Sequence, residues 1–197
     1  MAAFFGGGGT AVLPGQYTVK LTVDGKSYSE PLAVKMDPGI HYRMEALQAQ
    51  AQMVDQIKAL QVKVGAAHDV AQLRKQLESL GPKAAGQKKL AAAITTLDQN
   101  AKQIEGFATP PSPDSSGEGG AEPAPDSLKG LSATLMKMSL GAQQGGLEPP
   151  TPAVVTGYGK VQKTVDATLA RSHQLETTDV AQLNARLSAA RLPTVHL

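Results

Sequence analysis

The chain contains no cysteine and no tryptophan among its 197 residues, and aromatic residues make up only 4% of it. Without cysteine, disulfides, thiolate catalysis and cysteine-ligated metal sites are excluded. Because aromatic side chains are scarce, Ala, Leu and Val must supply most of the burial. This composition favours helices packed at close range over an aromatic-rich sandwich.

An excess of charge of one sign is also lacking, since 19 Lys and Arg residues stand against 17 Asp and Glu residues. We therefore expect no nucleic-acid partner, because phosphate binding requires a concentrated basic face. The sequence has no apolar run of about 18 residues, so no membrane span is expected. The opening MAAFFGGGG lacks the basic and apolar regions of a signal peptide.

No sequence pattern indicates a reaction centre. Gly25-Lys26-Ser27 resembles the end of a phosphate-binding loop, but Lys20 stands where that motif needs glycine, and a predicted strand follows instead of a helix. The four histidines have no metal-binding spacing. We expect no enzyme, no cofactor and no metal. Acidic residues of the predicted helices are expected on solvated faces: Glu45, Asp55, Glu78 and Asp98.

The segment 14–37 predicts a β-hairpin. Apolar and polar residues alternate along 17–23, and Asp24-Gly25 is typical of a two-residue type I′ turn. That turn would place Leu21 opposite Tyr28 and Val19 opposite Glu30. Pro31 predicts an edge strand or a bulge. The predicted interaction residues share one face of the hairpin: Tyr17, Val19, Leu21, Val23, Tyr28, Leu32 and Val34.

Apolar residues at helical spacing predict four main helices and a short last one. The first covers about 40–80, with Asp37-Pro38 as a candidate start and Gly65 as a candidate bend, and the second covers about 84–105. The third extends from Leu128 towards Gly141, the fourth starts at Thr151-Pro152, and Thr178 is expected to cap the last. The predicted fold class is mainly α with a small β part, in which the hairpin precedes an antiparallel helical bundle.

The domain organisation that follows has five parts. Residues 107–126 are rich in Pro, Gly and Ser, and we expect them to be disordered unless a partner holds them. The parts are a flexible lead-in at 1–13, the hairpin at 14–37, a long helical hairpin at 38–106, the linker at 107–126 and a second helical pair at 127–197. Five methionines are expected to fill the core, with an adaptable binding groove as the alternative: Met36, Met44, Met53, Met136 and Met138.

The stretch LPGQYTVKLTVDGKSYSEPLAVKMDP at 13–38 resembles the C-terminal tail of bacterial exported proteins with BNR-repeat or sortilin-like β-propellers, often labelled glycosyl hydrolases. In that family a Pro-Gly-x-Tyr-Thr-Val strand, an Asp-Gly-Lys turn and a Val-Lys-Met-Asp-Pro exit precede a helical tail. This chain has the three motifs at 14–19, 24–26 and 34–38. Its ending LNARLSAARLP at 183–193 is also similar, whereas the glycine run at 6–9 departs from the pattern.

The resemblance implies that the hairpin is the last pair of strands of an immunoglobulin-like sandwich, with Tyr17 near the start of the penultimate strand. It also implies a periplasmic or extracellular location. Any hydrolase activity would belong to the propeller, so the resemblance assigns no catalytic residue here. The implied partner is another protein chain or an upstream propeller or immunoglobulin-like domain, and a homo-oligomer is the alternative.

A lone two-stranded hairpin is marginally stable in water, so its apolar face requires a cover. We expect that face to lie on the helices or to pair with another chain by strand addition. This predicts a non-enzymatic interaction or assembly module, and we expect a ribbon fully wet on both faces to overturn its docking role. The alternative is an accessory substrate-binding domain of an exported glycan- or peptide-processing propeller protein, using Tyr17, Tyr28 and Tyr42.

Overall fold

The computed structural model describes residues 12–67, 69–106, 123–143 and 146–196, and it confirms a mainly helical chain with a small β part. Most of the expected lead-in and linker lies outside the described residues. The elements are β1 (Gly15–Val23), β2 (Lys26–Val34), α1 (Met44–Ala66), α2 (Asp69–Leu80), a 3-10 turn (Pro82–Ala84), α3 (Lys88–Glu105), α4 (Leu128–Gln143), α5 (Pro152–Gln174), a π-helical segment (Leu175–Asp179) and α6 (Val180–Ala189).

The hairpin has the predicted turn and register. Asp24 and Gly25 have positive φ angles of 50° and 77°, as a type I′ turn requires. Leu21 pairs with Tyr28 and Val19 with Glu30, and the pairing is regular from Gly15↔Val34 to Val23↔Lys26. The ladder therefore continues through Pro31 without a bulge.

The single helix expected over about 40–80 is wrong, because α1 ends at Ala66 and α2 begins at Asp69. Buried apolar positions in α1 end at Val64, and those in α2 begin at Val70. The apolar stripe here repeats at three-residue steps, which would turn it around an uninterrupted helix and away from the core. The break lets both helices direct their stripes inwards, whereas Gly65 lies inside the last turn of α1.

Two predicted helix starts are also wrong, and one is confirmed. Asp37 does not cap α1: its side chain accepts a hydrogen bond from the Gly39 amide at 2.8 Å, in a turn before the helix. Thr178 does not cap α6, because it lies in the π-helical segment that joins α5 to α6. Thr151 does cap α5, since its hydroxyl accepts from the Val154 amide at 3.4 Å and Pro152 takes the first helical position.

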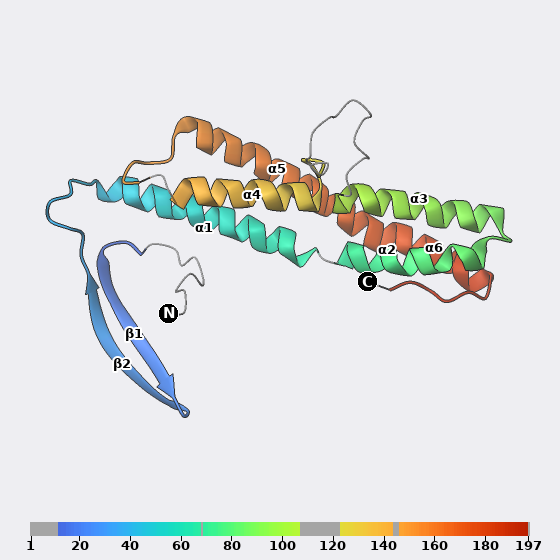
Figure 1. Cartoon of the computed structure of the whole chain (residues 1–197), viewed down its shortest axis with the longest axis horizontal. Helices are drawn as coiled ribbons and strands as arrows, with labels where there is room; N and C mark the ends of the chain where they lie inside the picture. The colour runs from blue at the N-terminus through green and yellow to red at the C-terminus, as the bar shows by residue number, and fades with distance from the viewer. Residues whose placement is uncertain (1–11, 68, 107–122, 144–145, 197) are drawn as a thin grey trace, which may run out of the picture.

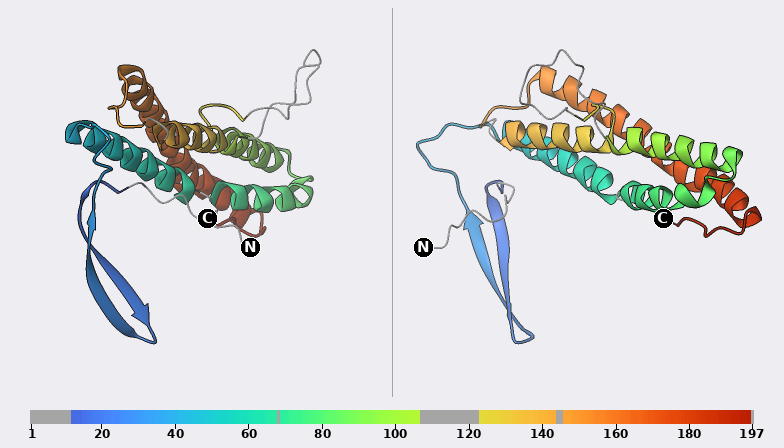
Figure 2. Two further views of the ribbon diagram at one scale, coloured as in Figure 1. Left: turned by 60° about the vertical axis from the view of Figure 1, so that its left-hand side comes forward. Right: turned by 45° about the vertical axis from the view of Figure 1, so that its right-hand side comes forward.

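The helices lie in three rows, which Figures 1 and 2 show from different sides. α2 follows the direction of α1, α4 continues beyond the end of α3, and α6 continues α5. Along the bundle, α1 contacts α4 and α5, whereas α2 contacts α3, and α3 contacts α6. The chain thus runs along the bundle in α1 and α2, returns in α3 and α4, and runs along it again in α5 and α6. The row of α3 and α4 is therefore antiparallel to the other two rows.

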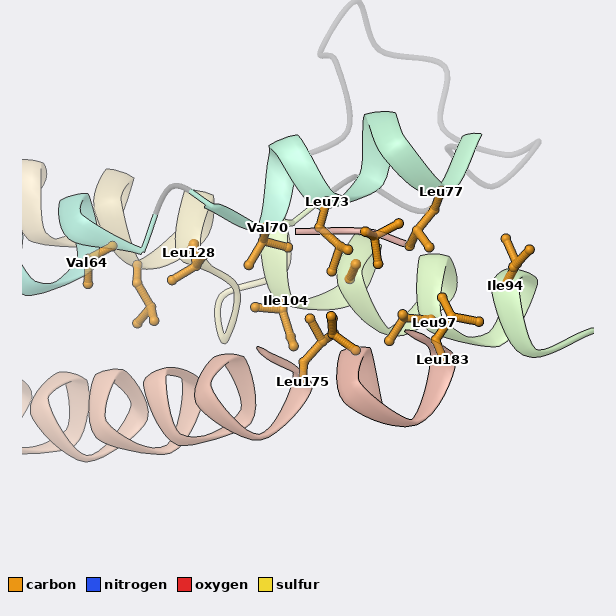
Figure 3. Packing of buried hydrophobic residues seen from close by; sticks show 14 of the residues in the cluster. Val64, Val70, Leu73, Leu77, Ile94, Leu97, Ile104, Leu128, Leu175 and Leu183 are labelled. Carbon is orange, nitrogen blue, oxygen red and sulfur yellow. The ribbon is translucent and has the colours of Figure 1, made fainter. Parts of the chain in front are cut away.

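One hydrophobic core runs through the bundle. Leu73 and Leu77 of α2, Leu97 and Ile104 of α3, and Leu175 beyond α5 point towards one another (Figure 3). The stripe expected for the second helix is confirmed, although α3 begins at Lys88 rather than near residue 84. All five of its members are buried: Leu90, Ile94, Leu97, Ala101 and Ile104.

Candidate functional site

The candidate site is the apolar face of the hairpin. This face carries the seven side chains that the sequence predicts to interact with a partner. Strand pairing places all seven on the same face of the ribbon, since Tyr17 pairs with Leu32 and Leu21 with Tyr28. Six of them are between 36% and 59% exposed, and Val34 is half-buried. The exposed six are Tyr17, Val19, Leu21, Val23, Tyr28 and Leu32.

The apolar face also carries two charged residues. Glu30 faces Val19 in the middle of the ribbon, and Lys26 faces Val23 beside the turn. The opposite face is polar except for Pro31 and Ala33, and Lys20 is its one charged residue within the described strands. The two faces therefore differ sharply in polarity, which is the pattern of a strand pair with one face meant for burial.

The hairpin projects away from the helices instead of lying on them (Figures 1 and 2). Every described residue from Gly15 to Ala33 is exposed, on the apolar and the polar face alike. Of the two covers that the sequence left open, the helices of the same chain are therefore the wrong one. The face described here is bare in the single chain.

Local contacts hold the base and the tip of the hairpin. The Tyr17 hydroxyl donates to the Leu13 carbonyl at 2.6 Å, which ties the strand start to the preceding segment. Near the turn, the hydroxyls of Thr22 and Ser27 are 3.1 Å apart on the polar face. These contacts leave the apolar face free, so they stabilise the ribbon without covering it.

A second concave feature lies at the end of the bundle where α5 starts. It is a pocket of about 610 Å³ between α1, α4 and α5, lined by Met53, Met138, Val154 and Val161 among others. A side chain added at the lining Gly157 would meet nothing within 4 Å. The absence of a side chain at this glycine thus leaves the space open. The volume and the lining of the space are typical of a binding pocket.

The pocket partly revises the expectation for the methionines. Met53 is buried in the core and Met138 packs against it, as expected, but both also line the pocket. Met136 is 61% exposed, so its expected place in the core is wrong. None of the described residues lining the pocket is Tyr17, Tyr28 or Tyr42, the three aromatic residues proposed for substrate contact.

Neither the pocket nor the hairpin carries a metal site, and among the described residues no group of three or more His, Asp or Glu side chains could hold a metal ion. Within the same residues, no helix has the length and apolar character needed to cross a bilayer. Comparison with models of protein families, with curated proteins and with solved structures finds no match to this chain. The resemblance to propeller tails therefore stays a prediction.

Sequence reasoning found the hairpin face and missed the pocket. Alternation of side chains is a local signal, so residues 17–34 reveal their shared face without any tertiary information. The pocket instead needs α1, α4 and α5 to meet, and its members come from residue 50 to residue 161. The available signals were the methionine groove kept as an alternative, since Met53 and Met138 line the pocket, and Gly157 within a helical stretch.

Proposed function

We propose that the chain is a non-enzymatic interaction module, in which the hairpin docks on a partner protein and the helical bundle acts as its platform. The observation that carries the proposal is the apolar face of the ribbon. Six large apolar or aromatic side chains are exposed there within two paired strands of nine residues each. Contiguous exposed apolar surface of this kind marks interaction sites more often than chance placement does.

A two-stranded ribbon can do little to stabilise itself. Such ribbons gain independent stability only with further strands or with a packed face. Burying a side chain such as Leu21 or Val19 in a partner contributes about 1.5–3 kcal/mol relative to leaving it in water. A partner that covers the face would therefore stabilise both the ribbon and the complex.

Exposure of both faces is the arrangement that we expected to overturn docking, and the single chain has it. One chain by itself displays only the uncovered state of an interaction surface. The two faces also remain chemically unequal, since the apolar one carries Tyr17, Leu21 and Leu32 and the other carries Thr18 and Thr22. The criterion that separates the alternatives is the behaviour of the chain with its partner in solution.

The test combines capture from the native source with light scattering. The full chain is immobilised, bound protein is identified by mass spectrometry, and the mass of the recovered complex is measured by size-exclusion chromatography. We expect a complex heavier than the 20.4 kDa chain. The double variant Val19→Thr, Leu21→Thr should lose the complex, because it makes the centre of the apolar face polar while keeping strand propensity.

The matched control is Val62→Thr with Val155→Thr. Both valines are exposed on the bundle, at 72% and 50%, so the chemical change is the same kind of loss of exposed apolar surface away from the hairpin. This control should retain the complex. A wild-type chain that stays monomeric, captures nothing and behaves like the Val19 and Leu21 variant would refute the proposed function.

A further inference from the structure

The backbone of the hairpin offers two free edges, and they are not equivalent. In a hairpin with a two-residue loop, the residues that flank the loop exchange both of their hydrogen bonds. Val23 and Lys26 are that pair here. Because hydrogen-bonded and non-hydrogen-bonded pairs alternate, the next pair, Thr22 and Ser27, directs its backbone groups outwards.

Counting along the ladder assigns the outward groups of each strand. On β1 the outward amides and carbonyls belong to Gln16, Thr18, Lys20 and Thr22, and all four amides can donate. On β2 they belong to Ser27, Ser29, Pro31 and Ala33. Pro31 has no amide hydrogen, and its ring occupies the place where a partner carbonyl would approach.

Pro31 therefore interrupts the outer edge of β2 while leaving the ladder between the strands intact. This explains why β2 pairs regularly through Pro31, since the missing donor never faced β1. Proline on a free edge is a known device against strand addition. The outer edge of β1 contains no proline along its nine residues.

We infer that β1 provides the docking edge, and that its partner is a strand of another polypeptide laid along Gln16–Thr22. This inference rests on the proposed function and specifies its geometry. The chemistry of the partner strand follows from the two faces of β1. It carries apolar side chains beside Tyr17, Val19 and Leu21, and polar ones beside Thr18 and Thr22.

The charge of Lys20 further restricts the sequence of the partner strand. Lys20 is the one charged side chain on the polar face of the described strands and lies in the middle of the β1 edge. An acidic residue next to it would form a favourable cross-strand pair, whereas a basic residue would be repelled. The expected partner strand therefore alternates apolar and polar residues and has Asp or Glu at its centre.

A second copy of this chain fits the edge less well than such a partner. Two β1 strands paired antiparallel would satisfy their edges, but the apolar faces of both ribbons would lie on the same side of the new sheet. The bare surface would double instead of being covered. A partner that adds a strand to the edge of β1 and covers the apolar face with a second sheet satisfies both needs.

The test uses the full chain and a synthetic nine-residue peptide in which threonine and valine alternate and a glutamate takes the central polar place. Amide hydrogen exchange is followed by NMR with and without excess peptide. We expect exchange to slow at least about tenfold at the outward amides of β1. The outward amides of β2 at Ser27, Ser29 and Ala33 should be unaffected.

Two proline variants form the matched pair. Thr18→Pro removes an outward donor from β1, opposite Pro31, and Ser29→Pro does the same on β2; neither removes a bond between the strands. NMR contacts across the ribbon check that both variants keep the hairpin. Thr18→Pro should weaken peptide binding at least about tenfold, which corresponds to about 1.4 kcal/mol, and Ser29→Pro by less than about twofold.

Each other outcome overturns a specific statement. Protection on β2, or a larger loss in Ser29→Pro, refutes the choice of β1 but leaves docking by the hairpin standing. Protection that grows with chain concentration in the absence of peptide makes a second copy the occupant and refutes the partner strand. If no amide responds to the peptide, the edge inference fails, while the capture experiment with Val19→Thr, Leu21→Thr separately decides the proposed function.

Discussion

Arg74 of α2 forms three ion pairs through one guanidinium group. Its side chain is 9% exposed, and three guanidinium nitrogens reach three carboxylates: Nε to Asp98 at 3.2 Å, Nη1 to Glu105 at 2.9 Å and Nη2 to Glu78 at 3.3 Å. Lys102 and Lys129 also pair with Asp98 and Glu105. This network connects α2 to α3 beside the apolar core.

Replacing Arg74 with methionine should lower the free energy of unfolding by about 3 kcal/mol, because Asp98 and Glu105 would lose their shared buried partner. Urea unfolding followed by circular dichroism measures the change. Arg74→Lys should recover only part of it, since one ammonium group cannot reach three carboxylates in the guanidinium geometry. Equal stability of the wild type and the methionine variant would contradict the assigned role.

The protonation of Arg74 itself should not make the stability depend on pH in the ordinary range. Burial lowers the pKa of Arg74, but hydrogen bonds and charge from Glu105 and then Asp98 raise it more, so the net direction is upwards from the ordinary value of arginine. A folded-state pKa above the unfolded one gives stability that is complete below the unfolded pKa and is lost only as pH rises through the folded pKa. The loss through deprotonation of Arg74 therefore lies above the ordinary pKa of arginine.

Two glycines in helices should respond in opposite ways to alanine. A Cβ on Gly130 would lie 2.9 Å from the Ala124 carbonyl carbon and closer still to its oxygen, whereas one on Gly157 would meet nothing within 4 Å. Gly130→Ala should destabilise by about 1–3 kcal/mol through overpacking against backbone. Gly157→Ala should stabilise by about 1 kcal/mol through helix propensity. Thermal unfolding of both variants tests the contrast, and equal signs would refute it.

At the residue scale, sequence predicted what depends on neighbours along the chain and failed where distant residues meet. Asp98 was expected on a solvated face, but Arg74 from another helix encloses it. Ser127 was not anticipated as a cap, yet it is fully buried and its hydroxyl accepts from the Gly130 amide at 3.1 Å. The residues around Asp98 in the sequence do not indicate that α2 packs against it.

At the scale of elements, the segment after α6 shows how an extended strip of chain is fixed without a sheet. The Asn184 side chain donates to the Val195 carbonyl and accepts from its amide, both at 2.8 Å. Gln76 of α2 does the same for His196, at 2.6 and 2.9 Å. Val195 between them is 1% exposed and belongs to the core.

Asn184→Ala should therefore lower the free energy of unfolding by about 2 kcal/mol, since it removes two hydrogen bonds that are partly shielded from water. The Val195 amide should exchange with solvent much faster, which NMR can follow directly. Gln76→Ala is the matched control, because its two bonds are exposed and water can replace them at a cost of about 0.5 kcal/mol. A larger effect from Gln76 than from Asn184 would show that the segment is held differently.

Some elements can be predicted from the sequence more fully than others. The hairpin register was predictable, because Asp24-Gly25 determines the turn and the turn determines every pair. The division between α1 and α2 was not, because an apolar stripe that changes phase is compatible with a bend or with a break. Packing of α1 against α4 and α5, and of α2 against α3, decides for the break.

At the scale of the whole molecule, the described chain separates into a bundle with a continuous core and a ribbon outside it (Figure 1). The core cluster begins at Met53 and contains no residue of β1 or β2. The ribbon is thus a surface carried by the bundle, while the bundle draws its stability from the helices and from the segment after α6. This separation is what an interaction module with a rigid platform requires.

Removing residues 1–38 should therefore leave the bundle folded. Because no hairpin residue belongs to the core, the shortened chain should keep its helical circular dichroism, with a thermal midpoint within about 2 °C of the full chain. Removing residues 190–197 is the matched control: it takes away Val195 and its bonds to Asn184, and it should lower the midpoint by about 5 °C or more. If the hairpin deletion instead melted the bundle, the ribbon would have to pack on the helices in solution, and its apolar face would no longer be free to dock.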